Sequence, residues 1–247
     1  MNKNTINIII NLFRIKLGLD KANNMIDNYI SMSKENNLND IQRDGYKKYH
    51  NIIEKELEEL RLEIQAIIEK EIRKNESIIM DYGCGTGRYI KNFQKKAKVI
   101  GFDTNEHILQ TVTKKKIPNG LFYKLDFNNK TQFNDFLNKN NNKSDVFLLI
   151  EIIQILPRSE INNFISRVRK LMKNNSILII VYPVPNIFFD KYKNLGFYKY
   201  STKELKKILI KNSFKILISK ETKLNKQNKK YLKTKQDSKH MMVARKC

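Results

Sequence analysis

Apolar side chains recur three and four residues apart over residues 1–32 and again over residues 46–74. This spacing aligns them along one face of a helix, so each stretch predicts an amphipathic α-helix. A polar break over residues 33–45 separates the two. We therefore expect an N-terminal helical segment over residues 1–75. It would serve as a lid over a substrate pocket, as an extension packed on the following domain, or as a contact with a membrane surface.

From Ser77 onward, short apolar runs alternate with stretches of helical spacing, and the alternation predicts a mostly parallel sheet with helices on both faces. No helix separates the last two strands, so the last strand is expected to run antiparallel. The fold class is thus α/β: a seven-stranded, doubly wound sheet over residues 76–247, preceded by the N-terminal helices. Strands are predicted over residues 77–82, 98–103, 121–126, 145–150, 176–182, 214–220 and 240–246, and helices over residues 87–96, 105–115, 130–139, 159–173 and 202–212.

The formal charge of +23 draws attention to nucleic acid as a partner. Lysine and asparagine have AT-rich codons, however, so a biased genome explains part of this excess. The last 47 residues carry about half of the charge, mostly in a lysine-rich stretch over residues 220–239. We interpret residues 221–239 as a loop between the last two strands, with Tyr231 as a group on which a base could stack.

Two cysteines, Cys84 and Cys247, are too few and too far apart to suggest a disulfide framework or a zinc site. No apolar run is long enough for a membrane-spanning helix, and the N-terminus has no secretory signal pattern. These features indicate a cytoplasmic protein without a membrane span.

Three glycines at alternate positions, Gly83, Gly85 and Gly87, follow the first predicted strand. Glycines let a backbone turn sharply and approach a ligand, and open α/β sheets bind ligands at the carboxyl ends of their strands. A dinucleotide-binding loop would need its third glycine at position 88, where this chain has Arg88. The loop therefore predicts a cofactor site of another kind.

Aspartates close the next two predicted strands. Asp103 ends the second strand, 18 residues after Gly85, where a carboxylate can accept hydrogen bonds from ribose hydroxyls; Thr104 and Asn105 would then cap the next helix. Asp126 ends the third strand. The competing interpretation is that Asp103 only caps a helix and that Asp126 only forms a turn.

Together these residues resemble the class I, Rossmann-like methyltransferases that depend on S-adenosylmethionine, over residues 77–247. The resemblance implies S-adenosylmethionine as cofactor. Asp81 would order the loop and the cofactor's amino group, the loop would wrap its amino-acid part, and Asp126 would bind the adenine amino group. The implied cofactor-binding residues are Asp81, Gly83, Cys84, Gly85, Gly87, Asp103, Thr104, Asp126 and Phe127, the last through backbone and ring contacts.

The residues after the fourth predicted strand bear on the acceptor. The D/N-P-P-Y/F/W string of nucleobase amino-methyltransferases is missing there, and Glu151 alone remains of the E-x-x-E-H string with which some relatives bind a metal, so we expect no metal. Glu151 and His50 are the candidate catalytic bases, whereas His107 and His240 are interpreted as structural. We predict methyl transfer to an oxygen or nitrogen of a small molecule. The alternative is a nucleic-acid methyltransferase that uses the stretch over residues 220–239.

Overall fold

The computed structural model describes residues 58–73, 76–85, 87–104, 109–110, 112–113, 119–127, 129–184, 198–222 and 239–247. The chain divides into two compact units, Met1–Arg61 with Leu224–Thr234 and Leu62–Lys223 with Lys235–Cys247. Nearly all described residues belong to the second unit. The helix expected over residues 1–32, the polar break, His50, His107 and most of the lysine-rich stretch lie outside the described residues.

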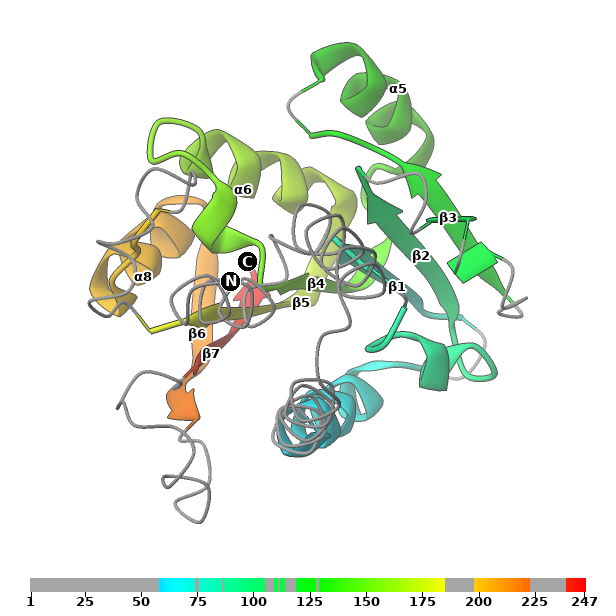
Figure 1. The fold of residues 1–247 in the computed structure, drawn as a ribbon, viewed down its shortest axis with the longest axis horizontal. Helices are drawn as coiled ribbons and strands as arrows, with labels where there is room; N and C mark the ends of the chain where they lie inside the picture. Colours follow the sequence, from blue (N-terminus) through cyan, green and yellow to red (C-terminus); the bar gives the residue numbers. More distant parts are fainter. Residues whose placement is uncertain are drawn as a thin grey trace, which may run out of the picture. The chain divides into compact units, whose positions relative to one another are not determined.

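Seven strands form one sheet in the order β3-β2-β1-β4-β5-β7-β6, which confirms the predicted fold class (Figure 1). Neighbouring strands from β3 to β5 pair in parallel, whereas β7 runs antiparallel to both β5 and β6. The strands are β1 (Ile78–Tyr82), β2 (Lys98–Asp103), β3 (Gly120–Lys124), β4 (Ser144–Ile150), β5 (Met172–Pro183), β6 (Phe214–Thr222) and β7 (Lys239–Lys246).

Three helices between the strands build the core on one face of the sheet: α5 (Lys130–Asn140), α6 (Ile161–Leu171) and α8 (Thr202–Lys211). Alternate strand residues such as Leu149 and Ile180 pack with Phe164 of α6 and Leu209 of α8 in one buried cluster. Figure 1 shows α6 alongside the strands β4 and β5. The central strands are buried on both faces, as expected where helices cover a parallel sheet.

The opposite face of the sheet meets the helical residues 62–71. Arg245 alternates along β7 with Ala244, which belongs to the cluster beneath α6 and α8, so the Arg245 side chain points to the other face. There its Nη2 donates to Glu71 Oε1 over 2.7 Å. Ile64 and Ile68 of the same helix are fully buried. This helix is the carboxyl part of the one predicted over residues 46–74, and it makes the sheet doubly covered.

The ends of the helices follow local sequence signals. Ser201 accepts a hydrogen bond from the backbone N–H of Glu204 over 3.2 Å at the start of α8. Asn129 caps α5 in the same way, by accepting from Gln132 N over 3.1 Å. Such caps satisfy backbone donors that a helix start leaves unpaired.

The segment after the glycine loop differs from prediction. Residues 87–96 were expected to be a helix, but they form turns around the short 3₁₀ helix η2 (Lys91–Phe93). Most backbone bonds there span three residues, such as those from Phe93 N to Ile90 O and from Lys96 N to Phe93 O, and the bond from Lys91 N to Gly87 O spans four. Ile90 and Phe93, three residues apart, are both buried, and a three-residue turn places both on one side.

The third strand also ends earlier than predicted. It stops at Lys124, two residues before Asp126, because the chain turns there and Asn129 N donates to Asp126 O over 3.0 Å. Asp126 therefore lies in the connection to α5 rather than in the strand.

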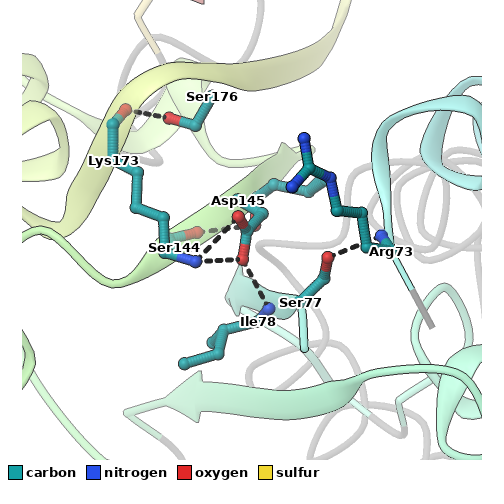
Figure 2. A network of polar contacts seen from close by, with 8 residues as sticks. Arg73, Ser77, Ile78, Ser144, Asp145, Lys173 and Ser176 are labelled. Carbon is teal, nitrogen blue, oxygen red and sulfur yellow. Dashed lines mark hydrogen bonds and ion pairs between the residues drawn. The ribbon is translucent and has the colours of Figure 1, made fainter. Parts of the chain in front are cut away.

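At the amino ends of the strands, a carboxylate joins three of them (Figure 2). Asp145 Oδ2 accepts a hydrogen bond from the backbone N–H of Ile78 over 2.7 Å. Both Asp145 oxygens also accept hydrogen bonds from Lys173 Nζ, over 2.9 and 3.0 Å. Ser77 Oγ in turn accepts from Arg73 N over 2.8 Å, which fixes the chain before β1. This network links the amino ends of β1, β4 and β5 at the edge of the sheet away from the glycine loop.

Candidate active site

The glycine loop leaves β1 at the carboxyl edge of the sheet with a backbone that other residues rarely adopt. Gly83, Gly85 and Gly87 have φ values of 70°, 52° and 73°. A Cβ atom on Gly83 would stand 2.2 Å from Cδ1 of Ile152, which lies just after β4. The left-handed backbone therefore requires glycine at position 83, and the Ile152 side chain would also have to shift to admit a Cβ.

Hydrogen bonds fix the loop against the end of β2. The backbone N–H groups of Gly83 and Cys84 both donate to Phe102 O, over 2.8 and 2.9 Å. The N–H of Gly85 donates to Asp103 Oδ2 over 3.0 Å. The glycine loop and Asp103, two separate elements of the predicted cofactor site, are thus in direct contact.

Asp81 and Cys84 flank the start of the loop, and both are buried. Asp81 lies in β1 between Gly101 of β2 and Leu148 of β4, with none of its surface exposed. A Cβ on Gly101 would stand 2.8 Å from Cys84 Sγ, so the glycine in β2 makes room for the thiol. Thr104 is exposed in the bend just after Asp103.

Phe127 and Tyr82 belong to a buried aromatic cluster beneath this edge. The ring centroid of Phe127 lies 4.3 Å from that of Tyr82, 4.9 Å from Phe133 and 5.1 Å from Phe164. The Phe127 carbonyl accepts a hydrogen bond from Arg167. The structure therefore gives the Phe127 ring a packing role, while its contact with a cofactor stays a prediction.

The carboxylates of Asp103 and Asp126 act electrostatically on the same phenol. Burial raises the pKa of Tyr82 well above its usual value, and the negative charges of Asp126 and Asp103 raise it further. The phenol is consequently protonated throughout the neutral range. Both aspartates are partly exposed.

Glu151, the candidate base, comes directly after β4 in a strained backbone conformation with a φ of 61°. Its N–H donates to Val181 O over 2.8 Å, and Gln154 Nε2 donates to both its carbonyl oxygen and its Oε2, each over 3.0 Å. Lys239 Nζ donates to the other carboxylate oxygen, Oε1. The Glu151 side chain is 5% exposed and that of Lys239 is 14% exposed. Both carboxylate oxygens are therefore engaged.

Lys239 was not singled out from the sequence. It lies at the end of the lysine-rich stretch, where composition gives no reason to prefer one lysine over another. Lys220, at the other end of that stretch, pairs with Glu63. Both boundary lysines thus have internal partners, and residues 223–238 lie outside the described part of the chain.

His240, interpreted as structural, lies in a buried polar network. Its Nε2 is 2.9 Å from Ser219 Oγ, and its Nδ1 is 3.5 Å from Thr202 Oγ1, which in turn lies 3.1 Å from Tyr182 Oη. Burial lowers the pKa of His240, and the nearby charge of Lys206 lowers it further. Burial also raises the pKa of Tyr182 to about 12. The network therefore joins neutral groups of α8, β5, β6 and β7.

Within the described residues, no group of three or more histidine, cysteine, aspartate or glutamate side chains is placed to hold a metal ion. Across the same part of the chain, no helix combines the length and apolarity needed to cross a membrane.

The strand order, the antiparallel β7 and the glycine loop at the end of β1 define an α/β methyltransferase fold, and solved structures agree. Magnesium protoporphyrin IX methyltransferase from Synechocystis PCC 6803 with bound SAH is 18% identical, with a TM-score of 0.58 over 85% of this chain and 88% of that one. A putative S-adenosylmethionine-dependent methyltransferase from Listeria monocytogenes is 16% identical, with a TM-score of 0.57 over 74% and 98%. The 4+2 cyclase SpnF is 14% identical, with a TM-score of 0.56 over 74% and 80%.

Residues 79–175 match the family model of the methyltransferase domain, and no curated protein matches the chain. The matched segment runs from β1 into β5 and includes the glycine loop, Asp103, Asp126 and Glu151. The chain therefore has the fold of the class I S-adenosylmethionine-dependent methyltransferases, and residues 79–175 are similar in sequence to the methyltransferase domain. The cyclase among its structural neighbours shows that this fold alone does not specify the reaction.

Proposed function

We propose that this protein transfers a methyl group from S-adenosylmethionine to an oxygen or nitrogen atom of a small molecule by direct displacement. The observation that carries the proposal is the contact between the glycine loop and Asp103. Three left-handed glycines and a carboxylate are fixed together at the carboxyl ends of β1 and β2. The methyl donor carries the reactive chemistry, and the protein supplies orientation.

The proposed cofactor site runs along the ends of the first three strands. The loop would wrap the amino-acid part of the cofactor, with Cys84 in its wall and the buried Asp81 ordering it. Asp103 would accept from the ribose hydroxyls next to Thr104, because each oxygen of a carboxylate can accept more than one hydrogen bond. Asp126 would bind the adenine amino group, with the backbone of Phe127 beside it.

The residues directly after β4 support a small molecule as the acceptor. The chain continues there as Glu151-Ile152-Ile153-Gln154, without the string that nucleobase amino-methyltransferases carry at this position. One structural neighbour is named for a small-molecule acceptor, magnesium protoporphyrin IX. Lys220 and Lys239 form internal ion pairs and so offer less charge to a nucleic acid than the composition suggests.

The catalytic roles are proposed in revised form. Glu151 lies at the acceptor end of β4, but its engaged oxygens suit it to positioning rather than to removing a proton. His50, which lies outside the described residues, stays a candidate base. The N-terminal segment over residues 1–75 is proposed as a packing extension in its last part, supported by the burial of Ile64 and Ile68, and as a lid in its earlier part.

Calorimetric titration with S-adenosylmethionine and S-adenosylhomocysteine tests the cofactor site, and saturable binding of both is expected. Incubation with methyl-labelled cofactor, a low-molecular-mass metabolite extract and total RNA then tests the acceptor. Label should enter the small-molecule fraction. Failure to bind either cofactor form would refute the proposal. Label in RNA, together with RNA affinity that falls steeply with salt, would establish the nucleic-acid alternative.

A further inference from the structure

The ion pair of Glu151 and Lys239 is the most buried pair of opposite charges among the described residues. It joins the end of β4 to the start of β7 at the carboxyl edge of the sheet. Removing one member of a buried pair leaves the charge of the other without compensation. The pair as a whole is electrically neutral.

The two members differ in what they can still bind. Glu151 uses both carboxylate oxygens, one for Lys239 and one for Gln154, and its side chain is the less exposed of the two. An ammonium group has three donors, and Lys239 gives one of them to Glu151. Lys239 is therefore the member of the pair that can donate hydrogen bonds to a ligand.

The described groups at this edge are poorly suited to removing a proton from an acceptor. Glu151 is engaged, and His240 is held between Ser219 and Thr202. An acceptor that is already deprotonated at neutral pH needs no such base. Carboxylic acids meet this condition, because their usual pKa lies near 4.

Resting on the proposed function, we propose that Lys239 binds the methyl acceptor through an anionic oxygen and that the acceptor is a carboxylic acid. An oxygen lone pair of the carboxylate forms the new bond to the methyl carbon. The bond between that carbon and the sulfonium sulfur breaks, and its electrons stay on sulfur. The products are a methyl ester and a neutral thioether, and no proton moves.

The charges of the site favour this acceptor. Because the charges of Glu151 and Lys239 cancel, the pair has no net negative charge to balance the positive charge of the methyl donor. A carboxylate acceptor supplies the missing negative charge, and transfer neutralises both. Attraction between opposite charges is strong where water is excluded, so a neutral or cationic acceptor would be held less well.

Three probes of one shape test the inference: benzoate, benzamide and benzylamine carry an anionic, a neutral and a cationic group on the same ring. Binding of each to protein saturated with S-adenosylhomocysteine is followed by NMR titration. Benzoate should bind about tenfold more tightly than benzamide, and benzylamine should not bind. Benzamide also tests whether the site prefers an amide. The buried Oε1 of Gln154 has no hydrogen-bond partner among the described residues and would accept from an amide N–H.

Two substitutions should move benzoate affinity in opposite directions. Lys239→Gln removes the ammonium and should abolish benzoate binding. Glu151→Gln frees the same ammonium from its partner and should tighten benzoate binding by about tenfold. Lys220→Gln is the matched control, because it breaks the ion pair with Glu63 at the other end of the stretch. None of the three should change the affinity for S-adenosylhomocysteine.

The outcomes separate the inference from the function on which it rests. If S-adenosylhomocysteine does not bind the unsubstituted protein, the proposed function fails, and the inference fails with it. If it binds but benzoate does not, or benzamide or benzylamine binds as well as benzoate, the carboxylate acceptor is wrong. A purely structural pair would weaken benzoate binding in both variants, so loss of affinity in Glu151→Gln would also overturn the role of Lys239.

Discussion

The backbone N–H of Gly85 donates to Asp103 Oδ2 over 3.0 Å and so joins the glycine loop to the end of β2. Asp103 thus orders the loop in the free protein. We propose a second task for its carboxylate, which is to accept hydrogen bonds from the ribose hydroxyls of the cofactor. Hydrogen bonds to a charged group are stronger than those between neutral groups, so this contact contributes more than an ordinary turn.

Replacing Asp103 should separate these two tasks. Asp103→Ala removes both and should weaken S-adenosylmethionine binding by about 1–3 kcal/mol in calorimetric titration. Asp103→Asn keeps one oxygen that can accept from Gly85 N, so its loss of affinity should be smaller. Asp135→Ala, which removes an exposed aspartate of α5, is the matched control. Unchanged affinity in Asp103→Ala would show that the ribose does not lie there.

Gly83 should tolerate no side chain. Gly83→Ala places a Cβ in a left-handed backbone and 2.2 Å from Ile152 Cδ1, so we expect loss of cofactor binding and lower stability. Ile152→Val removes that methyl group but leaves the backbone strain. The double variant should therefore regain part of the free energy of unfolding, measured by urea denaturation. Strictly additive effects of the two substitutions would show that the steric contact does not matter.

The main features of the sheet could be predicted from the sequence because they depend on patterns that few other folds produce. The apolar run from Val146 to Ile150 has the length and the composition of a strand buried on both faces, and it is one. Asp103 was placed at the end of β2 because an apolar strand stops there. The helix expected over residues 87–96 was wrong because apolar spacing does not distinguish an α-helix from successive three-residue turns.

The ion pair at the carboxyl edge of the sheet could not be predicted for a different reason. Glu151 and Lys239 are 88 residues apart, and only the antiparallel pairing of β7 with β5 brings them together. Lys239 is one lysine among many in its stretch, so its partner became apparent only from the fold. Similarly, the family pattern places Phe127 beside the cofactor, but the pattern does not specify that its ring packs against Tyr82.

Phe127 should matter more for stability than for cofactor affinity. Its ring is almost fully buried among Tyr82, Phe133 and Phe164, so Phe127→Ala should lower the free energy of unfolding by about 3–5 kcal/mol. Phe127→Leu, which keeps most of the volume, should fold and bind S-adenosylmethionine with nearly the affinity of the unsubstituted protein. A large loss of affinity in a stably folded Phe127→Leu would instead assign the ring to the cofactor site.

His240 should make the protein less stable in mild acid. Burial and the charge of Lys206 lower the pKa of His240 in the folded state, with Glu221 opposing them in part. As the pH falls below the usual histidine value of about 6.5, the unfolded chain binds a proton that the folded chain does not. Stability is therefore lost until the pH reaches the folded-state pKa, by about 1.4 kcal/mol for each unit between the two values.

Urea denaturation from about pH 7.5 to about pH 5 measures this contribution when the protein is compared with His240→Gln. The variant loses the hydrogen bond to Ser219 at every pH, but it has no imidazole to titrate. Its deficit in the free energy of unfolding should thus be largest near pH 7.5 and should shrink towards pH 5. A deficit that stays constant or grows in acid would mean that His240 is as easily protonated in the folded protein as in the unfolded chain.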